Sequence, residues 1–166
     1  RALRPVRADR AMSRAFVKDD DGGEGNEDLP DRLISEHPNL VKAAGLAGIE
    51  AEVARLSAAY AEAQAAADRI ALQRVARDLR YWTARRATAE LQDEPLSDGI
   101  VRFGSTVAIE RDDGRRQTFR IVGEDEANPA KGTLSYVSPL AQALLGSQAG
   151  DEVRAGAGRV EIVSVS

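Results

Sequence analysis

Residues 135–153 of the chain read SYVSPLAQALLGSQAGDEV. Ser138-Pro139 is typical of a helix start, because serine caps the first turn and proline fits its first position. Gly146 ends the apolar helical turn, and Gly150-Asp151 turns the chain toward a following strand. The stretch therefore predicts a strand, a short helix from Pro139 to Leu145 and a second strand, packed closely together.

The sequence on either side of this stretch carries strand signals. Short apolar runs at 100–103 and 106–109 flank Gly104, and Asp112-Asp113-Gly114 indicates a hairpin turn. Further strands are expected at 117–122, 134–137 and 160–165, with Val153 in another short one. Residues 97–166 are therefore predicted to form a small antiparallel β-sheet domain with one short helix, and the chain as a whole to be α+β.

Residues 41–94 show helical periodicity instead. The first apolar seam weakens to alanine at 65–67, where Asp68 is a candidate N-cap for a second helix. The first arm is mainly acidic and the second is rich in arginine, which suits antiparallel pairing. We therefore expect an antiparallel helical hairpin, a coiled coil, with one long helix as the alternative. The seams, at spacings of three and four, are Leu46, Ile49, Val53, Leu56, Tyr60, Ala63 and then Leu72, Val75, Leu79, Trp82.

The composition restricts the possible functions. The chain has 166 residues, a net charge of −4, no cysteine and one histidine. Disulfides, thiolate catalysis and cysteine-ligated zinc are thereby excluded, and a reducing cytoplasm is the expected location. No apolar run approaches the roughly 20 residues that span a bilayer, so we expect no membrane segment. The negative charge also argues against a global basic field for nucleic acid.

Candidate chemistry is sparse. No phosphate-binding or dinucleotide-binding glycine motif occurs, and we expect no catalytic residue and no metal site. Residues 1–40 are predicted to be a disordered acidic leader, in which His37 beside Pro38 is a surface turn residue. Glu124-Asp125-Glu126 is expected to be a solvated turn. Arg85 and Arg86 lie off the apolar seam, so they are candidates for a basic face that contacts a polyanion or an acidic protein, although such residues on a helix are most often a solvated face.

Several motifs resemble those of a known family. The stretches VRFGSTVAIERDDGRRQTFRIVGEDEA and LSYVSPLAQALLGSQAGDEV are similar to the C-terminal domain of the bacterial GreA/GreB transcript cleavage factors. The matches run in order from Ile100 to Val165. The preceding hairpin lies where this family has its coiled coil, and GLAGIEAE at 45–52 is similar to the opening turn of that coiled coil.

The resemblance implies an FKBP-like C-terminal domain without isomerase activity, which docks at the rim of the RNA polymerase secondary channel. On this basis Ser138, Pro139, Leu140 and Leu144 are the expected docking residues, with one leucine of the helix expected in the core. The coiled coil would enter the channel, and contact with nucleic acid, including DNA, would occur only within the polymerase complex. The resemblance also implies an accessory factor with no cofactor of its own, in which any RNA cleavage would be carried out by the polymerase. We further expect a monomer.

The resemblance also implies that two acidic residues at the coiled-coil tip help to hold Mg²⁺ in the polymerase active site. The family's tip motif, similar to GDLSENAEY, has no match here, and the turn EAQAAADRIALQ contains only Glu62 and Asp68 as acids. The hairpin is also shorter by about ten residues per arm, a loss of reach of roughly 15 Å. A carboxylate must approach Mg²⁺ to about 2.1 Å to bind it, so this departure argues against conventional cleavage stimulation.

Three functions are consistent with these features. The first is a regulator of transcription elongation that binds RNA polymerase at the secondary channel without strong cleavage stimulation. The second is a regulator resembling the nucleoside diphosphate kinase regulator, which would act on a metabolic enzyme or on polymerase without cleavage. The third is a conventional cleavage factor with a relocated acid pair at Glu62 and Asp68.

Overall fold

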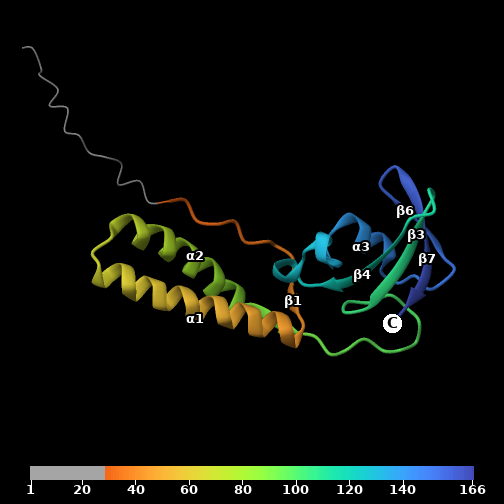
Figure 1. The fold of residues 1–166 in the computed structure, drawn as a ribbon. Helices are drawn as coiled ribbons and strands as arrows, with labels where there is room; N and C mark the ends of the chain where they lie inside the picture. The colour runs from red at the N-terminus through yellow and green to blue at the C-terminus, as the bar shows by residue number, and fades with distance from the viewer. Residues whose placement is uncertain (1–28) are drawn as a thin grey trace, which may run out of the picture.

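The computed structural model describes residues 29–166, which form a helical hairpin followed by a sheet domain (Figure 1). The predicted α+β class with an N-terminal antiparallel hairpin is confirmed. Within the described residues, no helix is both long and apolar enough to cross a membrane. The elements are β1 (Asn39–Val41), α1 (Ala43–Ala65), α2 (Arg69–Ala87), β2 (Ala89–Leu91), β3 (Thr106–Arg111), β4 (Arg116–Val122), the 3-10 turns η1 (Glu124–Glu126) and η2 (Pro129–Lys131), β5 (Thr133–Ser135), α3 (Pro139–Leu144), β6 (Glu152–Ala155) and β7 (Gly158–Val165).

The turn between α1 and α2 falls within the alanine run. Ala67 adopts a left-handed φ of 51°, and the Asp68 carboxylate accepts a hydrogen bond from the Ala71 backbone N–H at 3.0 Å. Asp68 is therefore the N-cap that the sequence predicted, since it satisfies one of the free N–H groups at the start of α2. α1 packs along α2, and its buried apolar side chains are Ile49, Leu56 and Ala63.

The base of the hairpin is closed by a two-stranded parallel sheet that the sequence did not reveal. β1 pairs with β2 in the register Asn39 with Ala89 and Val41 with Leu91. Three-residue strands with no alternation of their own give too short a pattern to be recognised. The pairing ties the start of α1 to the end of α2, so the two arms leave the junction together.

The N-terminal segment 29–38 runs beside α2 and corrects the predicted leader, which extended to residue 40 (Figure 1). Asp31 forms an ion pair with Arg80 at 2.6 Å, and the Arg32 guanidinium lies 3.7 Å from the centre of the Tyr81 ring. These charge and cation–π contacts supply the partners that an acidic segment lacks by itself. The rest of the predicted leader, residues 1–28, lies outside the described residues.

The C-terminal sheet has the order β5-β4-β3-β7-β6. Its pairs are antiparallel except β4 with β5, which are parallel, so the prediction of a purely antiparallel sheet is wrong at this edge. The run 100–103 is not a strand either: Ile100 makes a single bridge to Gln148, and the chain then turns at Gly104, whose φ is 90°. The core lies where α3 covers the sheet and contains Val107, Ile109, Ile121, Leu144 and Ile162, all with no exposed surface.

Candidate functional site

The expected docking helix α3 is fixed in place by hydrogen bonds at both of its ends. The Ser138 hydroxyl accepts a hydrogen bond from the Ala141 N–H at 3.3 Å, and Pro139 occupies the first turn. At the other end Gly146, with a φ of 84°, donates its N–H to the Val101 carbonyl at 2.9 Å. The helix is therefore held at both ends, and its start is presented to solvent at the exposed Pro139.

The predicted docking residues divide between the surface and the core. Ser138 is half-buried and Pro139 exposed, whereas Leu144 has no exposed surface and packs in the core. The docking role predicted for Leu144 is therefore wrong, because a side chain without accessible surface cannot meet a partner. Leu140 is half-buried against the core cluster. Gln142, which the sequence did not single out, is exposed on the same helix and donates its amide to the Tyr136 carbonyl at 2.7 Å.

Glu62 lies in the last turn of α1 and Asp68 is the N-cap of α2. The turn that joins these two helices lies at the far end of the hairpin from α3 (Figure 1). Glu62 and Asp68 are both exposed, but Asp68 already uses one carboxylate oxygen to cap α2. The turn between them is alanine, and Ile70 beyond it is 72% exposed. Within residues 29–166 no group of three or more acidic or histidine side chains is placed to hold a metal ion. The tip residues do not fit the magnesium-holding pair that the resemblance implies.

Arg85 is not part of a surface basic face, contrary to the sequence prediction. Its side chain is 2% exposed, and its Nε donates to Asp125 Oδ2 at 2.5 Å. Arg86, the next residue, is 57% exposed and pairs with Glu50 of α1 at 3.5 Å. Arg85 lies off the apolar seam, which suggested that it is exposed to solvent. Its side chain instead contacts η1, and the heptad pattern of the hairpin alone cannot reveal that contact.

The acidic trio 124–126 is correspondingly not a solvated turn. It forms η1 and faces the base of the hairpin, where Tyr81 donates its hydroxyl to Asp125 Oδ1 at 2.6 Å. Burial, and then the hydrogen bond to Asp125, raises the pKa of Tyr81 to about 12. Tyr81 and Arg85 are four residues apart and so share one face of α2; that spacing was the signal available in the sequence.

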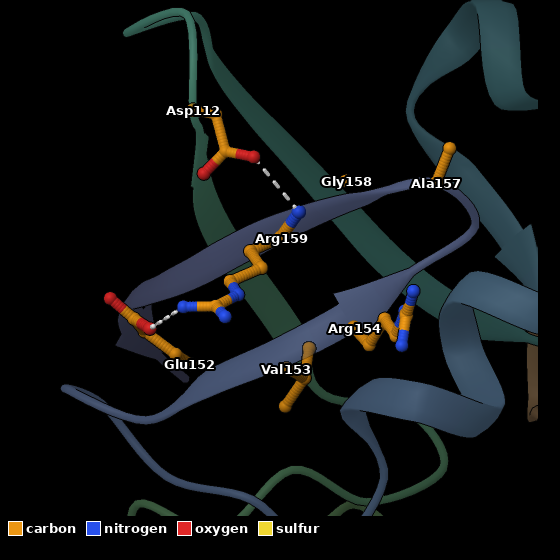
Figure 2. Close-up of a pocket in the computed structure, with 7 residues that line it drawn as sticks. All are labelled: Asp112, Glu152, Val153, Arg154, Ala157, Gly158 and Arg159. Atoms are coloured by element: carbon orange, nitrogen blue, oxygen red, sulfur yellow. Dashed lines mark hydrogen bonds and ion pairs between the residues drawn. The ribbon is translucent and has the colours of Figure 1, made fainter.

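The remaining hollows offer little chemistry. An open cavity of about 690 Å³ lies between the β6–β7 hairpin and the β3–β4 turn (Figure 2). Asp112 accepts a hydrogen bond from the Arg159 backbone N–H at 3.0 Å, and the Arg159 side chain pairs with Glu152 at 3.7 Å. Two of the charged side chains that line this cavity, Glu152 and Arg159, thus pair with each other, and Asp112 is bonded to the backbone. His37 is exposed.

The geometry defines a protein in which a helical hairpin projects from a sheet domain. Comparisons with known proteins identify the family. A family model described as transcription elongation factor, GreA/GreB, C-term, matches residues 96–166. A transcription elongation factor GreA from Desulfovibrio desulfuricans is 40% identical over 141 residues, which cover 81% of this chain and 83% of the relative. A GreB from Neisseria meningitidis serogroup B is 40% identical over 100 residues, 57% of this chain and 61% of the relative.

The chain therefore belongs to the GreA/GreB family of transcription elongation factors. The solved structure of GreA factor homolog 1 from Thermus thermophilus covers 78% of this chain and 99% of its own, with 21% identity and a TM-score of 0.38. The family assignment rests on the sequence matches, which include the domain that holds α3.

Proposed function

We propose that the chain binds RNA polymerase and regulates transcription elongation, with its C-terminal domain at the rim of the secondary channel and its hairpin entering that channel. The observation that carries the proposal is the 40% identity to a GreA over 81% of the chain, which spans both the hairpin and the sheet domain. The start of α3, where Pro139 is exposed and Ser138 is half-buried, supports docking through this helix. The domain is expected to have the FKBP-like fold without isomerase activity.

The proposed role is that of an accessory factor and not of a free-standing enzyme. α1 has 23 residues and so extends for about 34 Å. A hairpin of this length can insert into a channel of a partner protein. Any RNA cleavage in the complex would be carried out by the polymerase. The protein would act as a monomer in the cytoplasm, where its partner works.

Cleavage stimulation of the conventional kind is not part of the proposal. It would require two free carboxylates at the tip, close enough to bind the same Mg²⁺ at about 2.1 Å. Asp68 is engaged in capping α2, and the residues between Glu62 and Asp68 are glutamine and alanines. An alanine tip can occupy space near the polymerase active site without contributing a metal ligand.

Contact with nucleic acid is proposed only within the polymerase complex. Three arginines of α2 are paired with acids of the same chain: Arg80 with Asp31, Arg85 with Asp125, and Arg86 with Glu50. Ion pairs of this kind reduce the net positive charge that a phosphate backbone would meet. These three side chains would therefore add little to binding of DNA outside the polymerase complex.

A binding experiment tests the proposal. The full chain is titrated onto core RNA polymerase, alone and in competition with a cleavage factor of the same family. We expect saturable binding and mutual exclusion, with Pro139→Ala weakening the affinity by about fivefold, the effect of losing roughly 1 kcal/mol at an interface. Pro129→Ala is the matched control, because Pro129 is also an exposed proline at the start of a short helix, η2.

The outcomes separate the candidate functions. No binding to core polymerase, or binding that leaves the cleavage factor in place, would overturn the proposal. Recovery of a nucleotide-metabolising enzyme in place of polymerase, when the tagged chain is used to capture partners from lysate, would favour the second function considered above.

A further inference from the structure

We propose that Arg85 and Tyr81 of α2, both bound to Asp125 of η1, are positioning residues that set the direction of the hairpin relative to the C-terminal domain. The inference rests on the proposed function, because the direction matters when one domain docks and the other projects. We call this set of three residues the clasp. None of the three touches a reacting atom in the proposal.

The first observation is that the clasp uses both oxygens of one carboxylate. Arg85 Nε donates to Asp125 Oδ2 at 2.5 Å, and the Tyr81 hydroxyl donates to Asp125 Oδ1 at 2.6 Å. The two donors lie one helical turn apart, so α2 grips Asp125 at two points along its axis. Two charge-assisted contacts to a single planar group restrain orientation as well as distance.

The second observation is the burial of the cation. Arg85 is the one residue of α2 that is buried, and its backbone carbonyl also accepts the Asn39 side-chain amide at 2.6 Å. A buried guanidinium must remain paired, because an unpaired buried charge is strongly unfavourable. A rotation of the hairpin that separated α2 from η1 would leave the buried Arg85 charge without Asp125. The clasp therefore disfavours such a rotation.

The third observation is that α1 and β1 approach η1 without room for a side chain. A Cβ at Gly45 of α1 would lie 2.2 Å from Glu126 Cδ, and a Cβ at Gly123 would lie 2.4 Å from the Leu40 carbonyl oxygen. η1 is thus contacted by α1, α2 and β1 together. Glycine at both positions allows the close fit in which the clasp distances are met.

Small changes in this junction produce large displacements at the tip. An arm of about 34 Å that swings by about 10° moves its end by about 6 Å. That is larger than the tolerance of a contact in a channel, where a shift of about 1 Å already affects function. The clasp is therefore the part of the molecule that determines the direction of the hairpin relative to the C-terminal domain.

The test measures direction in the free protein. The chain has no cysteine, so Ala65→Cys at the exposed tip and Ser164→Cys on β7 can carry spin labels for distance measurement. Arg85→Met is expected to broaden the tip-to-domain distance distribution or to shift it by about 6 Å. Arg86→Met is the matched control: it removes the same charge one residue later, from a pair with Glu50 that lies within the hairpin.

An unchanged distance distribution in Arg85→Met would overturn the proposal. If Arg85→Met does not fold by circular dichroism, Tyr81→Phe decides in its place, since it removes one hydroxyl and leaves the ion pair. A distribution in Tyr81→Phe as narrow as that of the parent would then refute the clasp.

A second readout separates positioning from general stability. Arg85→Met is expected to bind core polymerase within about twofold of the parent, because α3 is untouched, while its effect on elongation falls at least fivefold. Equal loss of both would indicate a merely structural role and refute positioning. If the parent chain does not bind polymerase, the proposed function fails, and the distance measurement still decides the clasp.

Discussion

Gly123 provides a stringent test of the close packing at the junction. Its φ of −66° is accessible to any residue, so alanine there carries no backbone strain and only the added methyl group matters. That Cβ would lie 2.4 Å from the Leu40 carbonyl oxygen in β1 and 3.2 Å from Glu126 Oε2. The Leu40 atom is backbone held in the β1–β2 pair and cannot swing aside as a side chain does.

The two segments must therefore separate by roughly 1 Å to restore an ordinary contact. Overpacking of this size typically costs about 1–3 kcal/mol, and we expect Gly123→Ala to lower the free energy of unfolding by about 2 kcal/mol. Gly45→Ala is expected to cost less, because the atoms it meets are the end of the flexible Glu126 side chain. Gly48→Ala, in α1 with no atom within 4 Å of the added Cβ, is expected to stabilise by about 0.5–1 kcal/mol through helix propensity.

Urea unfolding followed by far-ultraviolet circular dichroism measures all three variants against the parent. The order of stability expected is Gly48→Ala above the parent, then Gly45→Ala, then Gly123→Ala. A Gly123→Ala protein as stable as the parent would show that β1 and η1 do not approach as closely as described. A Gly48→Ala protein as destabilised as Gly123→Ala would refute the attribution to contact with Leu40.

Three further expectations concern single side chains. The pKa of Tyr81 is raised from its ordinary value near 10 to about 12, so the stability that its neutral hydroxyl contributes is present below about pH 10 and is lost between there and about pH 12. Across this range the free energy of unfolding should therefore fall less in Tyr81→Phe than in the parent. An equal fall in both proteins would contradict the contact with Asp125. Leu144→Ala should lower the unfolding free energy by about 2–5 kcal/mol, and a change under about 0.5 kcal/mol would place Leu144 at the surface instead. Asp68→Ala should cost about 1 kcal/mol through loss of the cap on Ala71, with no change in unfolding free energy as the contradicting result.

The sequence predicted those parts of the fold that depend on local pattern. The hairpin turn followed from the alanine run and the Asp68 cap, and α3 followed from Ser138-Pro139 and Gly146. Each of these signals acts within a few residues of the structure it produces. Most strands of the C-terminal domain could be located in the same way, whereas the run 100–103 and the turn η1 could not.

The junction could not be derived, because it depends on residues far apart in the sequence. Arg85 and Asp125 are 40 residues apart, and neither is unusual within its own segment. The heptad pattern placed Arg85 off the seam, which is correct for the hairpin alone and wrong once η1 packs against it. Leu144 shows the converse: its family resemblance suggested a surface role, while its position in α3 directs it into the core.

The most direct test of the central claim is transcript cleavage in a stalled, backtracked elongation complex, with a GreB factor as the positive control. We predict that the full chain competes with GreB for the complex and slows GreB-dependent cleavage, while by itself leaving the transcript at its intrinsic cleavage rate. Transcripts shortened by the chain alone at a rate close to that of GreB, with the effect abolished in Asp68→Ala, would contradict the account.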